Sequence, residues 1–407
     1  MKKRTLLPVL AMVLLGGCAS PAMLVTIDRA DINATRRAAA AGEKTVTPAY
    51  DALITRAEAA LKAKPRTITA QTVTPPSGDK HDYMSMGPYW WPDPKKPDGL
   101  PYIRRDGEHN PEFYKMESRG WLIETCNNVQ TLSYAWFFSG EEKYAEKAAQ
   151  LLKVFFLDPE TKMNPNLTYG QSIPGRCTGR GIGLIDTRIL GQTMDAIILL
   201  DGSRAWTAKD KAAMQDWVRT FYHWMLESEI GKDEGRQPNN HASAYDFQIC
   251  AYAIFCGEPE VARRQLEQVT FGRMDVQFPA DASQPLELKR TNSWGYSTGN
   301  LNMWMELVNV GDILGIDLWS WKNKAGVSLK EVVEWYFPHI LEGKPWFKKD
   351  ISSTRSPASI DRVMKVYCRK FCPERYPEFV EGIKKFTNSP KYDFDTSVYN
   401  LLYPVNG

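Results

Sequence analysis

Apolar residues recur along this chain almost everywhere with the spacing of an α-helix, and the helical segments come in pairs. Short breaks that contain glycine or proline separate the two members of a pair, as Ser139-Gly140, Asp201-Gly202 and Pro373 do. The paired segments are residues 117–138 with 141–157, 185–201 with 208–229, 240–256 with 259–271, 298–315 with 328–342, and 358–371 with 375–387, after a first helix at 49–63.

Successive helical hairpins in one long chain predict an all-α fold built from antiparallel helix pairs. We expect an (α/α) toroid, or incomplete barrel, of about six or seven such pairs, in which inner helices present small and polar residues to a central cleft. No tight sequence repeat is visible, which argues against a regular solenoid. Because no low-complexity linker interrupts it, residues 46–407 are expected to form one catalytic domain.

Two long irregular stretches, residues 72–112 and 158–183, interrupt the helices. The first carries Gly87-Pro88-Tyr89-Trp90-Trp91-Pro92, and the second carries Gly179-Arg180-Gly181. Long loops without regular structure are uncommon in compact domains unless they have a function. We expect both stretches to form walls of the cleft.

The N-terminus has the pattern of an export signal. Three basic residues at positions 2–4 precede an apolar stretch, residues 6–15, that is too short to span a bilayer. Leu15-Gly16-Gly17-Cys18 resembles the lipobox of bacterial lipoproteins, in which the chain is cut before the cysteine and its thiol is lipidated. We therefore expect a signal peptide at 1–17, lipid on Cys18, and a tether at 18–45.

That pattern places the mature protein in the periplasm or at the outer membrane, in contact with the membrane only through its anchor. The alternative is ordinary secretion with an incidental cysteine. Removal of residues 1–17 brings the formal net charge from +3 to 0, so an acidic ligand needs a local basic cleft. Location and charge exclude nucleic acid as a partner, and we expect a monomer.

Metal and serine chemistry have little support in the sequence. The Gly-x-Ser-x-Gly pattern of a nucleophilic serine is absent. The histidines are scattered, with no pair at the spacing of metal ligands, and they are His81, His109, His223, His241 and His339. The sequence therefore predicts no metal site.

Asn239-Asn240-His241 and the later Arg290 and Tyr296 supply an amide, an imidazole, a guanidinium and a phenol. These groups are the ones needed to cut a uronate polymer by β-elimination. Asn240 and Arg290 would neutralise the carboxylate, which makes the proton on carbon 5 removable. A base takes that proton, and an acid protonates the leaving oxygen.

The positions of the carbon-5 proton and the leaving oxygen on the sugar ring decide which residue acts as base and which as acid. Where both lie on one side of the sugar, Tyr296 alone takes the proton and returns it. Where they lie on opposite sides, His241 is the base and Tyr296 the acid. A tyrosine base needs its pKa lowered from about 10 by positive charge, and Arg290 would supply that charge if the chain folds back.

The same segments are similar to the active-site segments of the alginate lyase family with the α/α-toroid fold. The similar residues are Asn239-Asn240-His241, Glu287 to Thr291, Tyr296-Ser297 and Asn300-Leu301, with further blocks at 163–187 and 87–92. The resemblance implies Asn240 and Arg290 at the carboxylate, His241 as base or neutraliser, and Tyr296 as base and acid. It also implies activity without a cofactor on an acidic polysaccharide.

Mannuronate-rich alginate is the expected substrate, with glucuronan or another polyuronate as alternatives. Aromatic residues of the loops can stack on sugar faces, and arginines can pair with flanking carboxylates. The candidate binding residues are Tyr89, Trp90, Trp91, Tyr169, Gln171, Arg180, Arg188 and Asn239.

Two other classes of protein remain open at this point. A glycoside hydrolase on the same toroid would need two carboxylates across the bond, and Asp186, Asp246 and Glu287 are available. A lipid-anchored glycan-binding protein would keep the aromatic loops without catalysis, but it has no need for the four reactive groups together.

Overall fold

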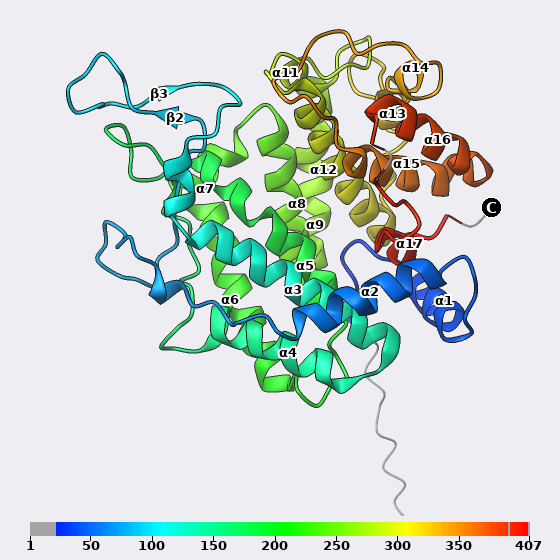
Figure 1. Ribbon diagram of the computed structural model, residues 1–407, viewed down its shortest axis with the longest axis horizontal. Helices are drawn as coiled ribbons and strands as arrows, with labels where there is room; N and C mark the ends of the chain where they lie inside the picture. The colour runs from blue at the N-terminus through cyan, green and yellow to red at the C-terminus, as the bar shows by residue number, and fades with distance from the viewer. Residues whose placement is uncertain (1–21, 390, 406–407) are drawn as a thin grey trace, which may run out of the picture.

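The computed structural model describes residues 22–389 and 391–405 (Figure 1). The predicted signal peptide at 1–17 and the predicted lipidation site, Cys18, lie outside the described residues. Within the described part of the chain, no helix is both long and apolar enough to cross a membrane.

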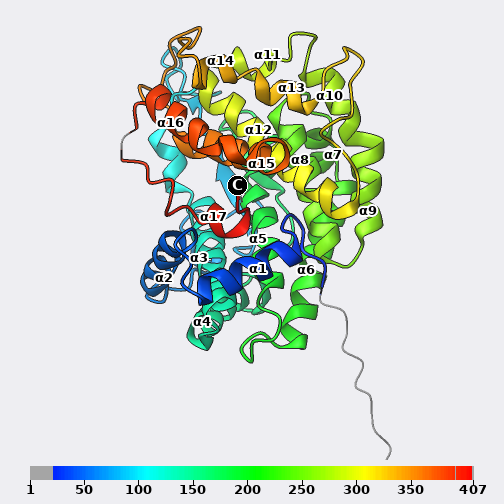
Figure 2. The same cartoon turned by 90° about the vertical axis from the view of Figure 1, so that its right-hand side faces the viewer.

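Five helices contact one another in chain order and form the inner layer of the fold (Figures 1 and 2). They are α3 (Ser118–Ser139), α5 (Arg188–Ile198), α8 (Asn240–Phe255), α12 (Ser293–Leu314) and α15 (Pro357–Phe371). Every residue of α8 is buried except His241. A helix that is covered on all sides belongs to the centre of the fold, so the exposure of His241 marks the place where this centre opens.

A second set of helices covers the inner layer. α4 (Glu142–Leu152) packs on α3, α6 (Ala208–Glu227) and α9 (Pro259–Gln265) pack on α8, and α16 (Tyr376–Thr387) packs on α15. The remaining helices are α1 (Arg29–Ala40), α2 (Thr47–Ala60), α7 (Glu229–Gly235), α10 (Phe271–Gln277), α11 (Pro285–Leu288), α13 (Leu329–Glu334), α14 (Phe337–Ile340) and α17 (Tyr399–Leu402). The predicted all-α toroid of paired helices is confirmed.

Local chemistry explains where these helices begin and end. Thr207 begins α6 with a capping box, in which its side chain and that of Asp210 exchange hydrogen bonds with the backbone. Gly140 and Gly315 end α3 and α12 in the left-handed conformation, with φ of 75° and 70°. The predicted helix at 259–271 is interrupted by a π-turn, Leu266–Thr270, before α10.

The prediction of a tether over residues 18–45 is wrong for residues 22–45. The backbone N–H groups of Val25 and Thr26 donate to the buried carboxylate of Asp195 on α5. The Thr26 hydroxyl also lies 2.8 Å from the Tyr403 hydroxyl, next to α17. The segment continues into α1, which contacts α17 (Figure 2). The segment is therefore part of the folded body rather than a linker.

The two irregular stretches hold the strands of the fold. β1 (Met84–Met86) pairs in parallel with β4 (Tyr169–Ser172), and β2 (Trp90–Trp91) pairs antiparallel with β3 (Ile103–Arg104). Figure 1 shows the β2–β3 hairpin on the same side of the molecule as α7. The hairpin is joined to the start of α12 by contacts described below.

A buried ion pair joins the last two inner helices. Arg362 on α15 binds Glu306 on α12, and their side chains are 7% and 2% exposed. Gln192 on α5 donates a hydrogen bond of 2.8 Å to the same carboxylate. Burial lowers the pKa of the Arg362 guanidinium, but Glu306 outweighs this effect and the net pKa is raised. Three inner helices therefore meet at one charge.

Candidate active site

Asn240 is the first residue of α8, and its environment begins the candidate site. The preceding residue, Asn239, is extended and makes no side-chain cap. Instead the Glu287 carboxylate, on α11, accepts the Asn240 backbone N–H at 2.7 Å. A carboxylate at a helix N-terminus is favoured by the helix dipole. No hydrogen bond within the described residues uses the Asn240 side-chain amide nitrogen, which leaves that donor available.

His241 is the next residue of α8, and its imidazole is held by an acid on α7. Its Nδ1 lies 2.7 Å from Oε1 of Glu234, on α7. The Glu234 side chain is fully buried, whereas the imidazole is 12% exposed. Burial raises the pKa of the Glu234 carboxyl, and the charge and hydrogen bond of His241 oppose that rise. The ring is therefore held by a buried acid, with its other nitrogen left free of protein partners among the described residues.

Arg290 and Tyr296 lie together at the start of α12. The guanidinium carbon of Arg290 is 3.6 Å from the centre of the Tyr296 ring. The guanidinium also forms a two-pronged contact with Asp106, with Nε 3.1 Å from both carboxylate oxygens and Nη2 2.6 Å from Oδ1. Asp106 further accepts the Thr291 N–H. The β2–β3 hairpin, which carries Asp106 just beyond β3, is thereby held against the site.

Arg290 does fold back onto Tyr296, as the supply of positive charge to the phenol requires, but its charge does not lower the pKa of Tyr296 below the ordinary value. Burial raises the pKa of Tyr296, the neighbouring Tyr89 adds to that rise, and Arg290 only opposes it. The Tyr296 hydroxyl is 2.7 Å from the Tyr89 hydroxyl. In this arrangement the phenol donates its hydrogen bond to Tyr89.

Electrostatic contacts connect the four groups into one region. The charges of Arg290 and His241 both lower the pKa of Glu287 against the effect of its burial. Glu234, the partner of His241, also interacts with Asp186. Asp186 and Tyr296 in turn both act on Arg188. Glu287 also joins the two halves by hydrogen bonds, because its carboxylate accepts the Asn240 N–H and its backbone carbonyl accepts the Arg290 N–H at 3.1 Å. The amide and imidazole at the start of α8 and the guanidinium and phenol at the start of α12, separated by up to 56 residues in sequence, are thereby connected.

Arg188, the first residue of α5, adds a positive charge to this region. Its side chain is exposed to solvent, and no ion pair or hydrogen bond holds it within the described residues. Surrounding protein lowers the pKa of its guanidinium and Arg119 adds to the effect, whereas Asp186 and Tyr296 oppose it. Arg188 is thus an unpaired positive charge close to Tyr296.

The other predicted binding residues divide into two groups. Gln171 and Arg180 are engaged with each other: Arg180 donates to the Gln171 carbonyl and side-chain oxygens at 3.1 and 3.0 Å. Gln171 is buried in the left-handed conformation, with φ of 48°, and also donates to Asp186. Such backbone strain in a non-glycine residue is characteristic of functional sites. Their place is a supporting wall rather than an open surface.

The predicted aromatic binding residues are partly covered by protein. Trp90 carries Arg176 and Arg180 against its ring, at 5.0 and 5.8 Å from the ring centre, and Trp91 carries Arg105 at 5.0 Å. Both indoles are half-buried. Guanidinium groups thus already cover part of the indole surface that was predicted to stack on sugars. Tyr169, at the start of β4, is half-buried as well.

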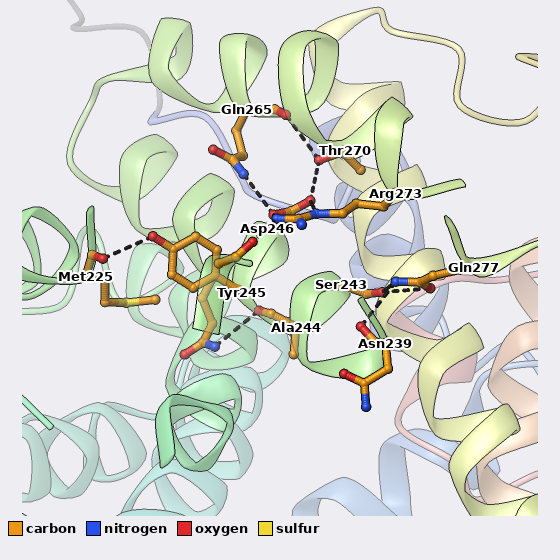
Figure 3. A network of polar contacts seen from close by, with 12 residues as sticks. Met225, Asn239, Ser243, Ala244, Tyr245, Asp246, Gln265, Thr270, Arg273 and Gln277 are labelled. Carbon is orange, nitrogen blue, oxygen red and sulfur yellow. Dashed lines mark hydrogen bonds and ion pairs between the residues drawn. The ribbon is translucent and has the colours of Figure 1, made fainter. Parts of the chain in front are cut away.

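The three carboxylates proposed for a hydrolase are all committed to protein partners. Asp246 is bonded to Arg273, Thr270 and Gln265 inside the fold (Figure 3). Asp186 accepts four hydrogen bonds from protein side chains. Glu287 caps α8. A hydrolase needs two carboxyl groups facing the bond, and these residues are 4% exposed or less.

Three acids hold the reactive groups: Asp106, Glu234 and Glu287. Sequence reasoning named Glu287 only as a possible hydrolase carboxylate and within a segment similar to the family, and it did not find the other two. Asp106 lies 184 residues from Arg290 in the chain, so no local spacing connects them. Glu234 is seven residues before His241, which is the nearest to a detectable signal. In the described part of the chain, no group of three or more His, Cys, Asp or Glu residues is arranged to hold a metal ion.

Comparisons with known proteins identify the family and the fold. The family model described as "Alginate lyase" matches residues 67–346. The structure is similar to that of an alginate lyase from Bacteroides ovatus, with a TM-score of 0.86 and 36% identity over 95% of this chain and 100% of that chain. Alginate lyase A1-III from Sphingomonas species A1 shares the fold, with a TM-score of 0.54 and 14% identity over 93% of this chain and 97% of that chain. No curated protein sequence matches this chain.

Proposed function

This chain belongs to the alginate lyase family, and from that premise we propose that it cleaves mannuronate-rich alginate by β-elimination. The chain is a polysaccharide lyase. The observation that carries the proposal is the connection of the reactive groups through Glu287. Its carboxylate accepts the N–H of Asn240, and its carbonyl accepts the N–H of Arg290. Arg290 in turn lies against the ring of Tyr296.

In the proposed reaction, the substrate carboxylate is neutralised by the free amide of Asn240 and by Arg290. Neutralisation stabilises the negative charge that develops when the carbon-5 proton leaves. In mannuronate this proton and the leaving oxygen lie on the same side of the ring, so one group serves both. Tyr296 takes the proton and returns it to the oxygen, and no cofactor is needed.

Tyr296 acts as a base only where positive charge offsets its raised pKa. Arg290 and Arg188 both lie close enough to affect the phenol. The Tyr89 hydroxyl, which raises that pKa, belongs to the same irregular stretch as Asp106. A uronate carboxylate is chemically similar to the Asp106 carboxylate, and both suit the planar fork of Arg290. We infer that substrate displaces Asp106 and loosens this stretch from the phenol.

Asp106→Asn is expected to tighten substrate binding. The change keeps the size of the side chain but removes the charge that competes for Arg290. The KM for alginate should fall by about three- to tenfold, the equivalent of about 1 kcal/mol. Steady-state kinetics on poly-mannuronate measure it. Asp98→Asn, in the same stretch but bonded to the Leu100 backbone, is the matched control. An unchanged or higher KM for Asp106→Asn contradicts the displacement of Asp106.

The products test the reaction class directly. Incubation with poly-mannuronate, poly-guluronate and glucuronan, followed by mass analysis, should give oligosaccharides that lack one water relative to hydrolysis products. Poly-mannuronate is expected to be the best substrate. Products of full hydrolytic mass would refute elimination, and a preference for glucuronan would move the proposed substrate to another polyuronate.

We also propose that the protein is anchored in the cell envelope through lipid on Cys18. The support is the basic, apolar and Leu-Gly-Gly-Cys pattern of residues 2–18. Labelled fatty acid should be incorporated into the wild-type protein and not into Cys18→Ser, which should leave the membrane fraction. Incorporation that persists in Cys18→Ser contradicts this assignment.

A further inference from the structure

A cavity of about 480 Å³ lies between two early helices and the C-terminal part of the chain. Its walls come from α2, from the second half of α3, and from residues 391–398, which precede α17. α2 packs on α3 and contacts α17 (Figure 1). The volume falls within the range of about 300–1,000 Å³ that is typical of small-molecule sites.

The cavity is separate from the candidate active site. Arg119, near the start of α3, binds Asp186 in the supporting wall of that site at 3.1 Å. Gln130 and Tyr134 line the cavity, and they lie about three and four helical turns further along α3, or roughly 16 and 22 Å along its axis. A ligand in this cavity would therefore be bound away from the reactive groups.

Two cations of the cavity lining lack an acidic partner. Arg56 on α2 and Lys391 are both exposed, and neither forms an ion pair among the described residues. Arg56 makes one long hydrogen bond, of 3.4 Å, to the Thr396 carbonyl. Burial lowers the pKa of its guanidinium, and no acidic group opposes that effect. Asp393 is the one acid on the described lining, so the lining carries an excess of positive charge.

Neutral hydrogen-bonding groups complete the polar part of the lining. Tyr134 is 5% exposed, and its hydroxyl makes no hydrogen bond within the part of the chain that the structure describes. Burial raises the pKa of this phenol, so it keeps its proton as a donor. Gln130 donates to the Thr193 hydroxyl at 2.9 Å, and its amide oxygen has no partner among the described residues. A buried hydroxyl without a partner costs free energy, and a ligand with hydroxyl groups would satisfy it.

Unpaired cations beside neutral hydroxyl and amide groups suit an acidic sugar. A uronate carboxylate fits the planar fork of Arg56, and a second carboxylate would reach Lys391. Sugar hydroxyls would bond Tyr134 and Gln130, and Asp393 can accept from a hydroxyl. The same carboxylate repels a compact and highly charged anion such as phosphate.

We propose that this cavity is a second saccharide site, which binds short uronate oligosaccharides outside the candidate active site. The choice of a uronate rests on the proposed function, because β-elimination of a polyuronate releases such oligosaccharides. The cavity would hold them on the enzyme without taking part in the reaction.

Calorimetric titration with a mannuronate trisaccharide tests this proposal in Tyr296→Phe, which should bind sugar without cutting it. Two binding sites per chain are expected. Adding Arg56→Gln and Lys391→Gln should weaken one of them by about tenfold or more and leave the affinity of the other unchanged. Lys62→Gln/Lys64→Gln is the matched control, since it removes two exposed cations just beyond α2 that do not line the cavity; both sites should remain.

Further titrations identify what the cavity recognises. Neutral mannotriose lacks the carboxylates and should not occupy the second site, and inorganic phosphate at equal ionic strength should not displace the uronate trisaccharide from it. Tyr134→Phe removes only a hydroxyl and should weaken the second site by about three- to tenfold. It also removes an unpartnered buried group, so the free protein should not lose stability.

Activity separates the two sites. With Tyr296 intact, Arg56→Gln/Lys391→Gln should cleave a mannuronate tetrasaccharide at the wild-type rate, because neither residue belongs to the candidate active site. The proposal would be overturned by a single site per chain in Tyr296→Phe, by two unchanged sites in the Arg56 and Lys391 variant, or by equal binding of mannotriose or phosphate. A wild type that forms no unsaturated ends from any polyuronate instead contradicts the proposed function. In that case the titration still decides whether the cavity binds the trisaccharide.

Discussion

Tyr296→Phe should reduce the formation of unsaturated products from alginate by about a thousandfold or more. The change removes one oxygen, and with it the group that protonates the leaving oxygen in either geometry of elimination. The ring remains, so its contact with Arg290 at 3.6 Å is preserved. Ultraviolet absorbance of the unsaturated ends measures the rate, and circular dichroism checks the fold.

Two other tyrosines sharpen this experiment. Tyr102→Phe removes a hydroxyl that binds Glu112, outside the candidate site, and should leave the rate unchanged. Tyr89→Phe removes a hydroxyl that raises the pKa of Tyr296, so the rise of activity with pH on poly-mannuronate should move to lower pH. Near-normal activity of Tyr296→Phe would show that another group transfers the proton.

Glu306→Leu should destabilise the protein by about 3–5 kcal/mol, the cost of leaving a buried charge without its partner. The Arg362 side chain is 7% exposed, so solvent has little access to its charge and does not replace the lost carboxylate. Gln192 loses its acceptor as well. Because the pair joins α12 to α15, the whole domain should unfold at lower denaturant. Urea denaturation followed by circular dichroism gives the free energy of unfolding.

The double variant Glu306→Leu/Arg362→Met distinguishes the loss of the ion pair from the cost of leaving Arg362 buried without a partner. With both charges gone, no buried ion is left unpaired, and most of the lost stability should return. Glu381→Ala, which breaks the exposed pair with Lys384, should leave the denaturation midpoint unchanged. A double variant as unstable as Glu306→Leu alone would mean that the loss comes from packing rather than from the unpaired arginine.

Local signals were sufficient to predict the helical architecture. A helix is specified by residues three and four apart, together with its caps, so α3, α6 and α16 fall close to their predicted bounds. The segment at 22–45 was missed because its function in the fold depends on Asp195, about 170 residues away in the chain. Hydrogen bonds between remote backbone and side-chain groups leave no periodic pattern.

In the candidate site, too, local features could be predicted from the sequence and contacts between remote residues could not. The reactive side chains could be recognised because chemistry demands their types, and the contact between Arg290 and Tyr296 followed from their short separation in sequence. The charges that surround them could not be derived from the sequence. Asp106 compensates Arg290, and burial outweighs Arg290 at Tyr296. Both effects depend on distances across the fold, which determine the protonation of the site.

The attachment of Val25 and Thr26 to Asp195 has a consequence for the enzyme at a bilayer. With lipid on Cys18, the chain from that residue to Ala22 reaches at most about 14 Å. A connection of this length would keep the folded domain close to the lipid headgroups and restrict its rotation. Asp195 lies about two helical turns from Arg188 along α5. The helix that holds the start of the folded chain therefore also carries a charged residue of the candidate site.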